Sequence, residues 1–320
     1  MTQLAALSAK ATVGDGSVSF PGVRAPDRSR DVDAGGVRIA VHEWGAPDAP
    51  PLMAMHGGFD FARTFDLFAP LLADAGWRVV SWDHRNHGDS EQAAMHSFPA
   101  DLRDAAWVIN SVTDMPVPIL GHSKGGALSL RLAEAWPHRI SHIINIDGMP
   151  ARRPMPDVSD RERTKLLTTE LEGWLDHHRR ASTGQRKPDT FEGLARRRSK
   201  MNPRLSHEWL CYLVTVGAYE APDGWRWKID PMMRMGGFGP FRPDWGLETM
   251  PGLPMPFLGI VGDQPEPMGW GSSATELRTF VPRHARLEVV PGTGHFVHIE
   301  EPEIVASLVL DFLAESAVPA

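Results

Sequence analysis

A serine in a glycine-rich turn carries the strongest chemical signature in this sequence. Ser123 is the central residue of Gly121-His122-Ser123-Lys124-Gly125, which follows the apolar run Val117 to Leu120 and precedes a helical pattern from Ala127 to Trp136. In such a G-x-S-x-G pattern the two glycines allow a tight strand-to-helix turn that lifts the serine hydroxyl above a sheet. The spacing therefore predicts a nucleophilic serine at residue 123.

A serine hydroxyl is a poor nucleophile at neutral pH and needs a neighbouring base. Two histidines near the end of the chain are candidates for this base. His295 follows Gly294 directly, and His298 lies three residues further on. His122, although adjacent to Ser123 in sequence, is expected to point elsewhere and to be structural.

The elements that must position these residues alternate between strand and helix over the first 150 residues. This alternation predicts a parallel sheet covered by helices on both faces. Ligands bind such sheets at the carboxyl ends of the strands. His56, Ser123 and Asp147 all follow the ends of predicted strands, so we expect them at one edge of the sheet.

The composition changes near Met149. The next hundred residues contain arginine runs, including Arg152-Arg153 and Arg196-Arg197-Arg198, and many Trp and Met residues. We predict a flexible tail at 1–30, a core at 31–149 and 251–320, and an inserted helical cap (lid) at 150–250. The Trp and Met side chains of the cap either line a pocket for a mostly apolar substrate or pack the cap on the core. The members of this set that we singled out are Trp174, Trp209, Trp225, Trp227, Trp245, Met201, Met232, Met233 and Met235.

The composition excludes several classes of partner. A formal charge of −7 gives no reason to expect nucleic acid or an anionic membrane surface. Cys211 is the single cysteine, so an internal disulfide is impossible, and no Cys/His spacing of the zinc type occurs. No apolar run reaches the roughly 18 residues of a membrane span. We therefore expect a cytoplasmic protein with no cofactor, no metal and a small-molecule substrate, and the sequence leaves a homodimer open.

Four motifs stand in an order that resembles one known family. The chain resembles the α/β-hydrolase superfamily, in its serine hydrolase branch with a helical cap, over about residues 36–150 and 250–315. The motifs are His56-Gly57-Gly58, Asp83-His84-Arg85-Asn86-His87-Gly88-Asp89-Ser90, Gly121-His122-Ser123-Lys124-Gly125-Gly126, and Gly294-His295-Phe296.

The resemblance implies an α/β-hydrolase fold, which is a mostly parallel central sheet flanked by helices, with an inserted mainly helical cap. It also implies that His295 rather than His298 is the base. Backbone N–H groups of Gly58 and Lys124 would form the oxyanion hole, with Phe59 as a substitute for Gly58.

The acid of a Ser-His-Asp triad is ambiguous. The family usually places it three residues beyond a glycine after the strand before the last, but here Pro265 stands three residues beyond Gly262. The superfamily also uses the end of the strand after the nucleophile helix, and Asp147 stands there. We prefer Asp147, keep Asp263 as the alternative, and rank Glu266 third.

Two further residues depart from the family pattern. Asn86 replaces a usual glycine in the turn from Asp83 to Ser90, whose polar side chains we interpret as structural. Lys124 occupies a position that is normally uncharged, at a helix N-terminus where a cation is disfavoured. Its side chain either attracts a substrate carboxylate or pairs with an Asp or Glu of the cap, and we favour the pairing.

These residues together predict a cofactor-free serine hydrolase. Its substrate would be a carboxylic ester, thioester or lactone with an apolar part, cleaved through an acyl-enzyme on Ser123. Dehalogenase and epoxide hydrolase activities are disfavoured, because those relatives use aspartate at this position. The alternatives are hydrolysis of a carbon–carbon bond in a diketone by the same triad, and a weakly catalytic ligand-binding receptor on the same fold.

Overall fold

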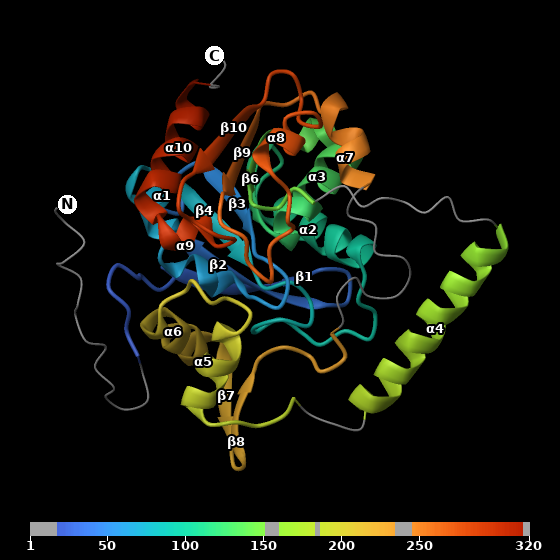
Figure 1. The fold of residues 1–320 in the computed structure, drawn as a ribbon. Coiled ribbons are helices and arrows are strands. Elements are labelled where there is room, and N and C mark those ends of the chain that lie inside the picture. The colour runs from blue at the N-terminus through green and yellow to red at the C-terminus, as the bar shows by residue number, and fades with distance from the viewer. Residues whose placement is uncertain (1–17, 151–159, 183–185, 234–244, 316–320) are drawn as a thin grey trace.

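An eight-stranded sheet forms the centre of the molecule in the computed structural model (Figure 1), which describes residues 18–150, 160–182, 186–233 and 245–315. The strand order is β1-β2-β4-β3-β5-β6-β9-β10. Strand β2 is antiparallel to both of its neighbours, and the strands from β4 to β10 pair in parallel. The strands are β1 (Arg28–Asp33), β2 (Arg38–Trp44), β3 (Pro51–Met55), β4 (Arg78–Trp82), β5 (Val117–His122), β6 (Ile140–Ile146), β9 (Phe257–Gly262) and β10 (Arg286–Val290).

Helices cover both faces of the sheet, because the central strands are apolar on both sides. In β3, for example, Met53 and Met55 join one buried cluster while Leu52 and Ala54 join another. The helices of the first cluster are α2 (Phe98–Val112), α3 (Lys124–Ala135), α7 (Trp245–Thr249) and α8 (Ala274–Leu277). Those of the second are α1 (Ala69–Asp74), α9 (Val297–Glu300) and α10 (Pro302–Glu315). The predicted fold class, a mostly parallel sheet flanked by helices, is confirmed.

A mainly helical insertion, which we call the cap, separates β6 from β9. It consists of α4 (Asp160–Ser182), α5 (Phe191–Ser199), α6 (His207–Gly217) and the hairpin of β7 (Ala218–Ala221) and β8 (Gly224–Trp227). A third buried cluster joins Trp209 and Leu213 of α6 to Phe61 and Phe296 of the core. In Figure 1 α5, α6 and the hairpin lie below the sheet, and α4 stands to the right. The cap is therefore anchored on core loops beside the strand ends.

The predicted N-terminal tail, residues 1–30, differs from the structure at its end. Residues 28–30 begin β1, because Arg28, Ser29 and Arg30 pair with the antiparallel strand β2. Val18 is buried against the cap. Residues 1–17 lie outside the described part of the chain, as do Arg152, Arg153 and Met235 of the cap prediction. No helix in the described part of the chain combines the length and hydropathy that a bilayer span needs.

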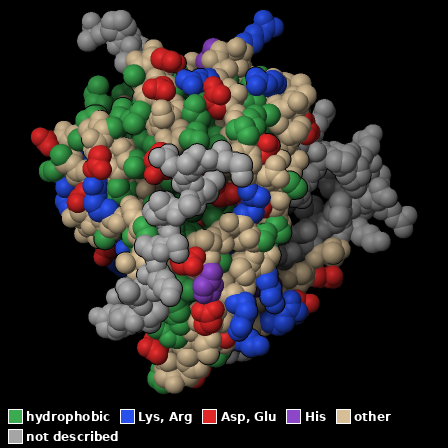
Figure 2. All heavy atoms as spheres, turned by 60° about the vertical axis from the view of Figure 1, so that its left-hand side comes forward, with side chains coloured by type: hydrophobic (Ala, Val, Ile, Leu, Met, Phe, Trp, Pro, Cys, Tyr) green, Lys and Arg blue, Asp and Glu red, His purple; other side chains and the backbone are tan. Residues whose placement is uncertain are grey.

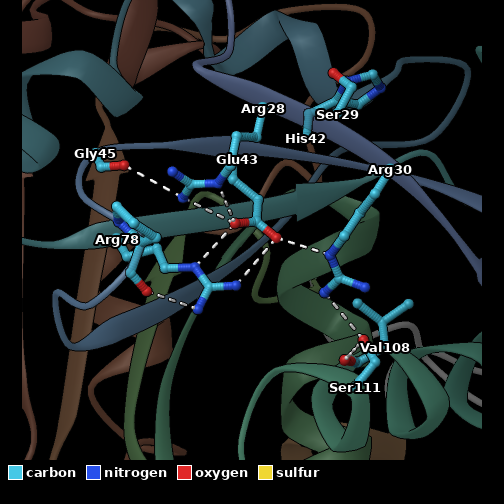
Figure 3. Close-up of polar contacts among 10 residues, drawn as sticks. Arg28, Ser29, Arg30, His42, Glu43, Gly45, Arg78, Val108 and Ser111 are labelled. Atoms are coloured by element: carbon cyan, nitrogen blue, oxygen red, sulfur yellow. Dashed lines mark hydrogen bonds and ion pairs between the residues drawn. The ribbon is translucent and has the colours of Figure 1, made fainter.

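The antiparallel end of the sheet is held by a buried carboxylate with three arginines around it (Figure 3). The Glu43 side chain is 2 % exposed and binds Arg28 and Arg30 of β1 and Arg78 of β4, at N–O distances of 2.9 to 3.0 Å. Burial alone would raise the pKa of the Glu43 carboxyl, but the hydrogen bonds from Arg78, Arg30 and Arg28 outweigh it and lower that pKa to about 2. One carboxylate thus ties three strands together.

This cluster predicts a pH-dependent contribution to stability. Because the folded-state pKa of Glu43 lies below its ordinary value of 4.5, its stabilisation is fully present above that value and is lost as the pH falls toward 2. We expect Glu43→Gln to lower the free energy of unfolding by about 1–3 kcal/mol at neutral pH. Urea unfolding of both proteins over a pH series should show this difference shrinking below pH 4.5. If the difference in the free energy of unfolding stayed constant at acidic pH, the stabilising role of the Glu43 carboxylate would be contradicted. The control is Glu288→Gln, which removes a carboxylate from the partly exposed pair with Arg286.

Candidate functional site

Ser123 lies on a strained turn between β5 and α3. Its φ of 52° and ψ of −118° fall where residues other than glycine are rare. The flanking glycines are required by close contacts: a Cβ on Gly121 would lie 2.4 Å from the Gly125 carbonyl oxygen, and one on Gly125 would lie 2.2 Å from that of Met55. The turn fixes the direction of the Ser123 hydroxyl before any ligand arrives.

His295 contacts both Ser123 and Asp147. Its Nε2 lies 2.9 Å from Ser123 Oγ, and its Nδ1 lies 2.5 Å from Asp147 Oδ2. A carboxylate only accepts, so Nδ1 carries the hydrogen and Nε2 is free to accept the hydrogen of the serine hydroxyl. The Ser123 and His295 residues are 9 % and 3 % exposed. A hydroxyl, an imidazole and a carboxylate in this order can move a proton off the serine oxygen.

Asp147 reaches the histidine from the end of β6. Its φ of 43° marks a second strained position, and its backbone N–H donates to Ile260 of β9 at 2.8 Å. The next residue is held as well, because the Gly148 N–H donates to Asn145 Oδ1 at 2.9 Å. The carboxylate is therefore aimed by backbone that is fixed on two sides.

The other two candidate acids, Asp263 and Glu266, accept hydrogen bonds from backbone N–H groups. Asp263 accepts from the Gly292 N–H at 2.8 Å on an exposed part of the surface. Glu266 accepts the backbone N–H of His295 at 2.6 Å, so it holds the main chain of His295 while Asp147 contacts the ring. Neither carboxylate contacts the His295 ring, and Asp147 does.

A second carboxylate and a cap arginine also hold the loop that carries His295. Glu300 accepts from the Gly294 N–H at 2.8 Å and from Arg204 Nε at 2.8 Å. Arg204, which precedes α6 in the cap, also donates to the Gly292 carbonyl oxygen. Loop and cap are thereby linked through polar contacts as well as apolar packing.

The rival histidines near Ser123 are buried and uncharged. His122 Nε2 donates to the His295 carbonyl oxygen at 3.0 Å, and burial lowers its pKa well below the ordinary value. His298 packs between Phe65 and Phe68, and burial lowers its pKa to about 3. Neither ring contacts the Ser123 hydroxyl in the described structure.

The predicted oxyanion loop lies against Ser123 and Lys124. A Cβ on Gly57 would lie 3.3 Å from Ser123 Cβ, and one on Gly58 would lie 3.8 Å from Lys124 Cβ. Phe59 follows with a φ of 58°. Lys124 is the first residue of α3, where backbone N–H groups have no acceptor within the helix. The loop of residues 57–59 thus lies beside the first residues of the turn and helix that carry Ser123 and Lys124.

His56 supports this loop from beneath. Its Nδ1 donates to the Gly57 carbonyl oxygen at 2.7 Å, and its Nε2 accepts the His84 backbone N–H at 3.0 Å. Because Nε2 accepts a hydrogen bond, it carries no proton and the ring is neutral. Burial favours this state by lowering the pKa of His56. The loop after β3 is therefore fixed to the turn after β4.

The polar side chains of that turn bind backbone groups of the turn itself and of the segments beside it. The Asp83 carboxylate accepts the Ala62 and Asp89 N–H groups, both at 2.7 Å. Asn86 has a φ of 68°. Its side-chain Nδ2 donates to the Ala93 carbonyl oxygen, and its Oδ1 accepts the Ala93 backbone N–H. Asparagine tolerates this conformation better than most residues, which explains how it replaces a glycine here.

The Lys124 ammonium has an intramolecular partner. Its Nζ lies 2.8 Å from Asp101 Oδ2, and the two side chains are 9 % and 0 % exposed. Asp101 belongs to α2 in the core, so the expectation of a partner in the cap is wrong, while the expectation of a carboxylate partner is right. The core carboxylate reaches Lys124 because α2 and α3 pack on the same face of the sheet.

Two triplets of ligand-type side chains lie close enough to share a metal ion in the described part of the chain. One contains Glu192, His207 and Cys211, and burial and two nearby carboxylates raise the pKa of its thiol to about 11, which disfavours the thiolate that a metal needs. The other is His42, Asp83 and Asp89, and Asp83 already accepts two backbone N–H groups there. Neither triplet includes Ser123 or His295.

The Trp and Met residues of the cap divide between the two predicted roles. Trp209 and Met233 are buried, whereas Trp174 and Met232 line a hollow of about 550 Å³ between α4 and residues 93–99. Trp227 and Met201 line a second hollow beside α5. The Trp245 side chain lies outside the described residues.

Several residues around the site have no recognisable signal in the sequence. Arg204 and Asp101 contact it from distant parts of the chain, and Glu300 folds back on the loop of His295 from the following helix α9. Glu266 matches a predicted candidate acid but holds the backbone of His295 instead.

Comparisons with known proteins agree with this architecture. Residues 50–302 match the family model described as the alpha/beta hydrolase fold. A serine hydrolase-like protein of Danio rerio is 23% identical over 282 residues, covering 84% of this chain and 83% of its own. The sn-1-specific diacylglycerol lipase ABHD11 of Mus musculus is 24% identical, covering 83% and 81%.

Solved structures show the same fold at low identity. The thioesterase domain from the curacin biosynthetic pathway superposes with a TM-score of 0.74 at 24% identity, covering 88% of this chain and 99% of its own. An esterase of M. tuberculosis superposes with a TM-score of 0.66 at 21% identity, covering 91% and 93%.

The buried pair beside Ser123 predicts a large effect on stability. Asp101→Asn leaves the Lys124 ammonium buried without its counter-charge, and we expect a loss of about 3–5 kcal/mol in the free energy of unfolding. Replacing both residues, as Lys124→Met with Asp101→Leu, should recover most of that loss, because no charge then stays buried. Urea unfolding of the single and double variants measures the coupling.

The control for this cycle is an ion pair on the exposed surface of α3. Arg131→Met breaks the pair with Glu134, whose side chains are 36% and 37% exposed, and should cost less than about 1 kcal/mol. If the double variant were as unstable as Asp101→Asn, packing rather than charge would explain the effect.

Proposed function

Since this chain belongs to the α/β-hydrolase fold family, we propose that it is a serine hydrolase that cleaves a carboxylic ester, thioester or lactone with an apolar part. One observation carries the proposal. The His295 ring lies between the Ser123 hydroxyl and the Asp147 carboxylate, at 2.9 and 2.5 Å. This arrangement supplies a nucleophile, its base and the group that fixes the base in the correct tautomer.

In the first half of the reaction Ser123 Oγ attacks the substrate carbonyl carbon. The hydroxyl proton passes to His295 Nε2, and Asp147 stabilises the resulting imidazolium. The carbonyl electron pair moves to the oxygen, which the backbone N–H groups of Lys124 and of Gly58 or Phe59 stabilise. Removing one such donor typically costs about 10²–10³ in rate.

The tetrahedral intermediate then collapses to the acyl-enzyme. The bond from the carbonyl carbon to the leaving oxygen or sulfur breaks, and the leaving group takes the proton from His295 Nε2. In the second half a water molecule gives a proton to the same nitrogen as its oxygen attacks the acyl carbon. Collapse of this second intermediate releases the acid, and the proton returns to Ser123 Oγ.

The surroundings support a substrate with an apolar part. Lys124 Nζ lies 6.0 Å from the centre of the Phe98 ring. The neighbours of Phe98 in the chain, Ser97 and Pro99, line the hollow to which Trp174 and Leu171 contribute. Two relatives, a serine hydrolase-like protein and a diacylglycerol lipase, also agree with ester chemistry.

A fluorophosphonate probe tests the nucleophile. We expect the wild-type protein to be labelled at one site, because the probe needs an activated serine, and Ser123→Ala to remain unlabelled. Mass spectrometry of the labelled peptide identifies the site, and circular dichroism confirms that the variant is folded. Folded wild-type protein that resists labelling would favour the binding-receptor alternative over the hydrolase.

The two candidate acids are separated by matched substitutions. Asp147→Asn should lower kcat by about 10⁴, because the amide no longer fixes the tautomer of His295 or stabilises its imidazolium. Asp263→Asn should retain most of the activity, because Asp263 contacts the Gly292 N–H rather than the His295 ring. The kcat of both variants on one p-nitrophenyl ester decides the matter, and the reverse result would exclude Asp147 as the acid.

A further inference from the structure

A second hollow, which we call the cationic pocket, lies beside α5. It has a volume of about 340 Å³ and is lined by Arg186, Lys187, Arg197, Arg198, Met201, Trp227 and Pro231. Four of these seven described residues are cations and none is a carboxylate. Figure 2 shows Lys and Arg side chains gathered on the lower part of the molecule, at the height of the cap in Figure 1. A hollow with this lining attracts anions.

The positive charge of the cationic pocket is only partly neutralised. Arg197 pairs with Asp189 at 2.9 Å, and Arg198 lies 3.7 Å from Asp60. Arg186 donates to two backbone carbonyl oxygens, those of residues 229 and 230, and its guanidinium interacts electrostatically with the Asp230 carboxylate. Lys187 is exposed and, within the described residues, has no carboxylate at ion-pair distance. The exposed Lys187 ammonium is therefore the cation of this pocket that is available to a ligand.

Arg198 connects the cationic pocket to the oxyanion loop. Arg198 lines the pocket, and its Nη1 donates to the Phe59 carbonyl oxygen at 2.8 Å. The same loop contacts Ser123 through Gly57. Arg198 Nε is buried and has no hydrogen-bond partner among the described residues. A guanidinium with an unused donor thus lies between the pocket and the loop beside the nucleophile.

The pocket also has an apolar wall. Trp227 lines it, and its ring lies 6.4 Å from that of Phe61, two residues after the oxyanion loop. Trp227 further borders a neighbouring hollow with Arg186 and Lys228. An extended ligand can therefore pack against an indole while its charged end contacts guanidinium and ammonium groups.

We propose that the cationic pocket binds an anionic group, a phosphate or a carboxylate, at the remote end of the substrate whose carbonyl carbon reacts with Ser123. Guanidinium forks match both anions geometrically. Lys124 does not supply this contact, because Asp101 already neutralises it. The inference rests on the proposed hydrolase function and narrows its substrate class to compounds with an apolar middle and an anionic end.

Two matched substrate pairs test the proposal and separate the two anions. The phosphate pair is the butyryl thioester of phosphopantetheine against that of pantetheine. The carboxylate pair is mono-p-nitrophenyl glutarate against p-nitrophenyl butyrate. We expect the wild-type enzyme to have the higher kcat/KM for the anionic member of one pair, and the ratio within that pair to fall about tenfold in Lys187→Glu, a change of about 1.4 kcal/mol.

The control substitution is Arg196→Glu. Arg196 is exposed on α5, the helix that carries Arg197 and Arg198, but does not line the pocket, and its replacement reverses one charge as Lys187→Glu does. The ratio of kcat/KM should stay at the wild-type value in this variant. Equal ratios in wild type and Lys187→Glu for both pairs, or an equal fall in Arg196→Glu, would overturn the proposal.

A binding measurement keeps this inference distinguishable from the hydrolase proposal. Inorganic phosphate or glutarate should raise the Tm of the wild-type protein above that in sodium chloride of equal ionic strength, and this rise should be lost in Lys187→Glu. If the fluorophosphonate probe labels Ser123 but neither anion raises the Tm, the cationic pocket is rejected and the hydrolase stands. If labelling fails and an anion still raises the Tm, the hydrolase proposal and the substrate role of the pocket are both rejected, and the pocket is an anion-binding site only.

Discussion

The site depends on one imidazole ring whose two nitrogens have partners on different segments of the chain. His295 must meet a hydroxyl on one side and a carboxylate on the other, each within hydrogen-bond distance. Ser123 follows β5, Asp147 follows β6, and His295 follows β10. A parallel sheet brings these segments together because all of its strands end at the same edge. Glu266, Glu300 and Arg204 hold the His295 loop in this geometry through hydrogen bonds. Such restraint matters for catalysis, because misplacement of a reacting group by about 1 Å can cost about 10²-fold in rate.

The other buried ionisable groups described around this ring are either neutral histidines or members of an ion pair. The buried histidines beside the site, His56, His122 and His298, are kept uncharged by burial. The buried Lys124 ammonium is opposed by the Asp101 carboxylate. An unpaired charge in this region would perturb the proton transfer that we propose for His295, since the low dielectric of an interior strengthens such interactions.

The cap does more than cover the sheet edge. Arg204 contacts the loop of His295, and Arg198 contacts the oxyanion loop. Phe61 follows the oxyanion loop and Phe296 follows His295. Both pack in the same buried cluster as Trp209 of the cap. Movement of this part of the cap would therefore change both halves of the proposed site together, and a ligand held in the cationic pocket would act on a segment already attached to the oxyanion loop.

The sequence by itself determined the fold class and the strand-to-helix turn of Ser123, because local spacing of glycines and apolar residues records both. It left the partner of His295 open between Asp147 and Asp263, since the family position after Gly262 holds a proline and spacing gives no distance between strand ends. Only the tertiary structure placed the Asp147 carboxylate against the ring. It also assigned Lys124 a core partner and gathered cations from separate segments into one pocket, because those contacts depend on how helices and loops pack.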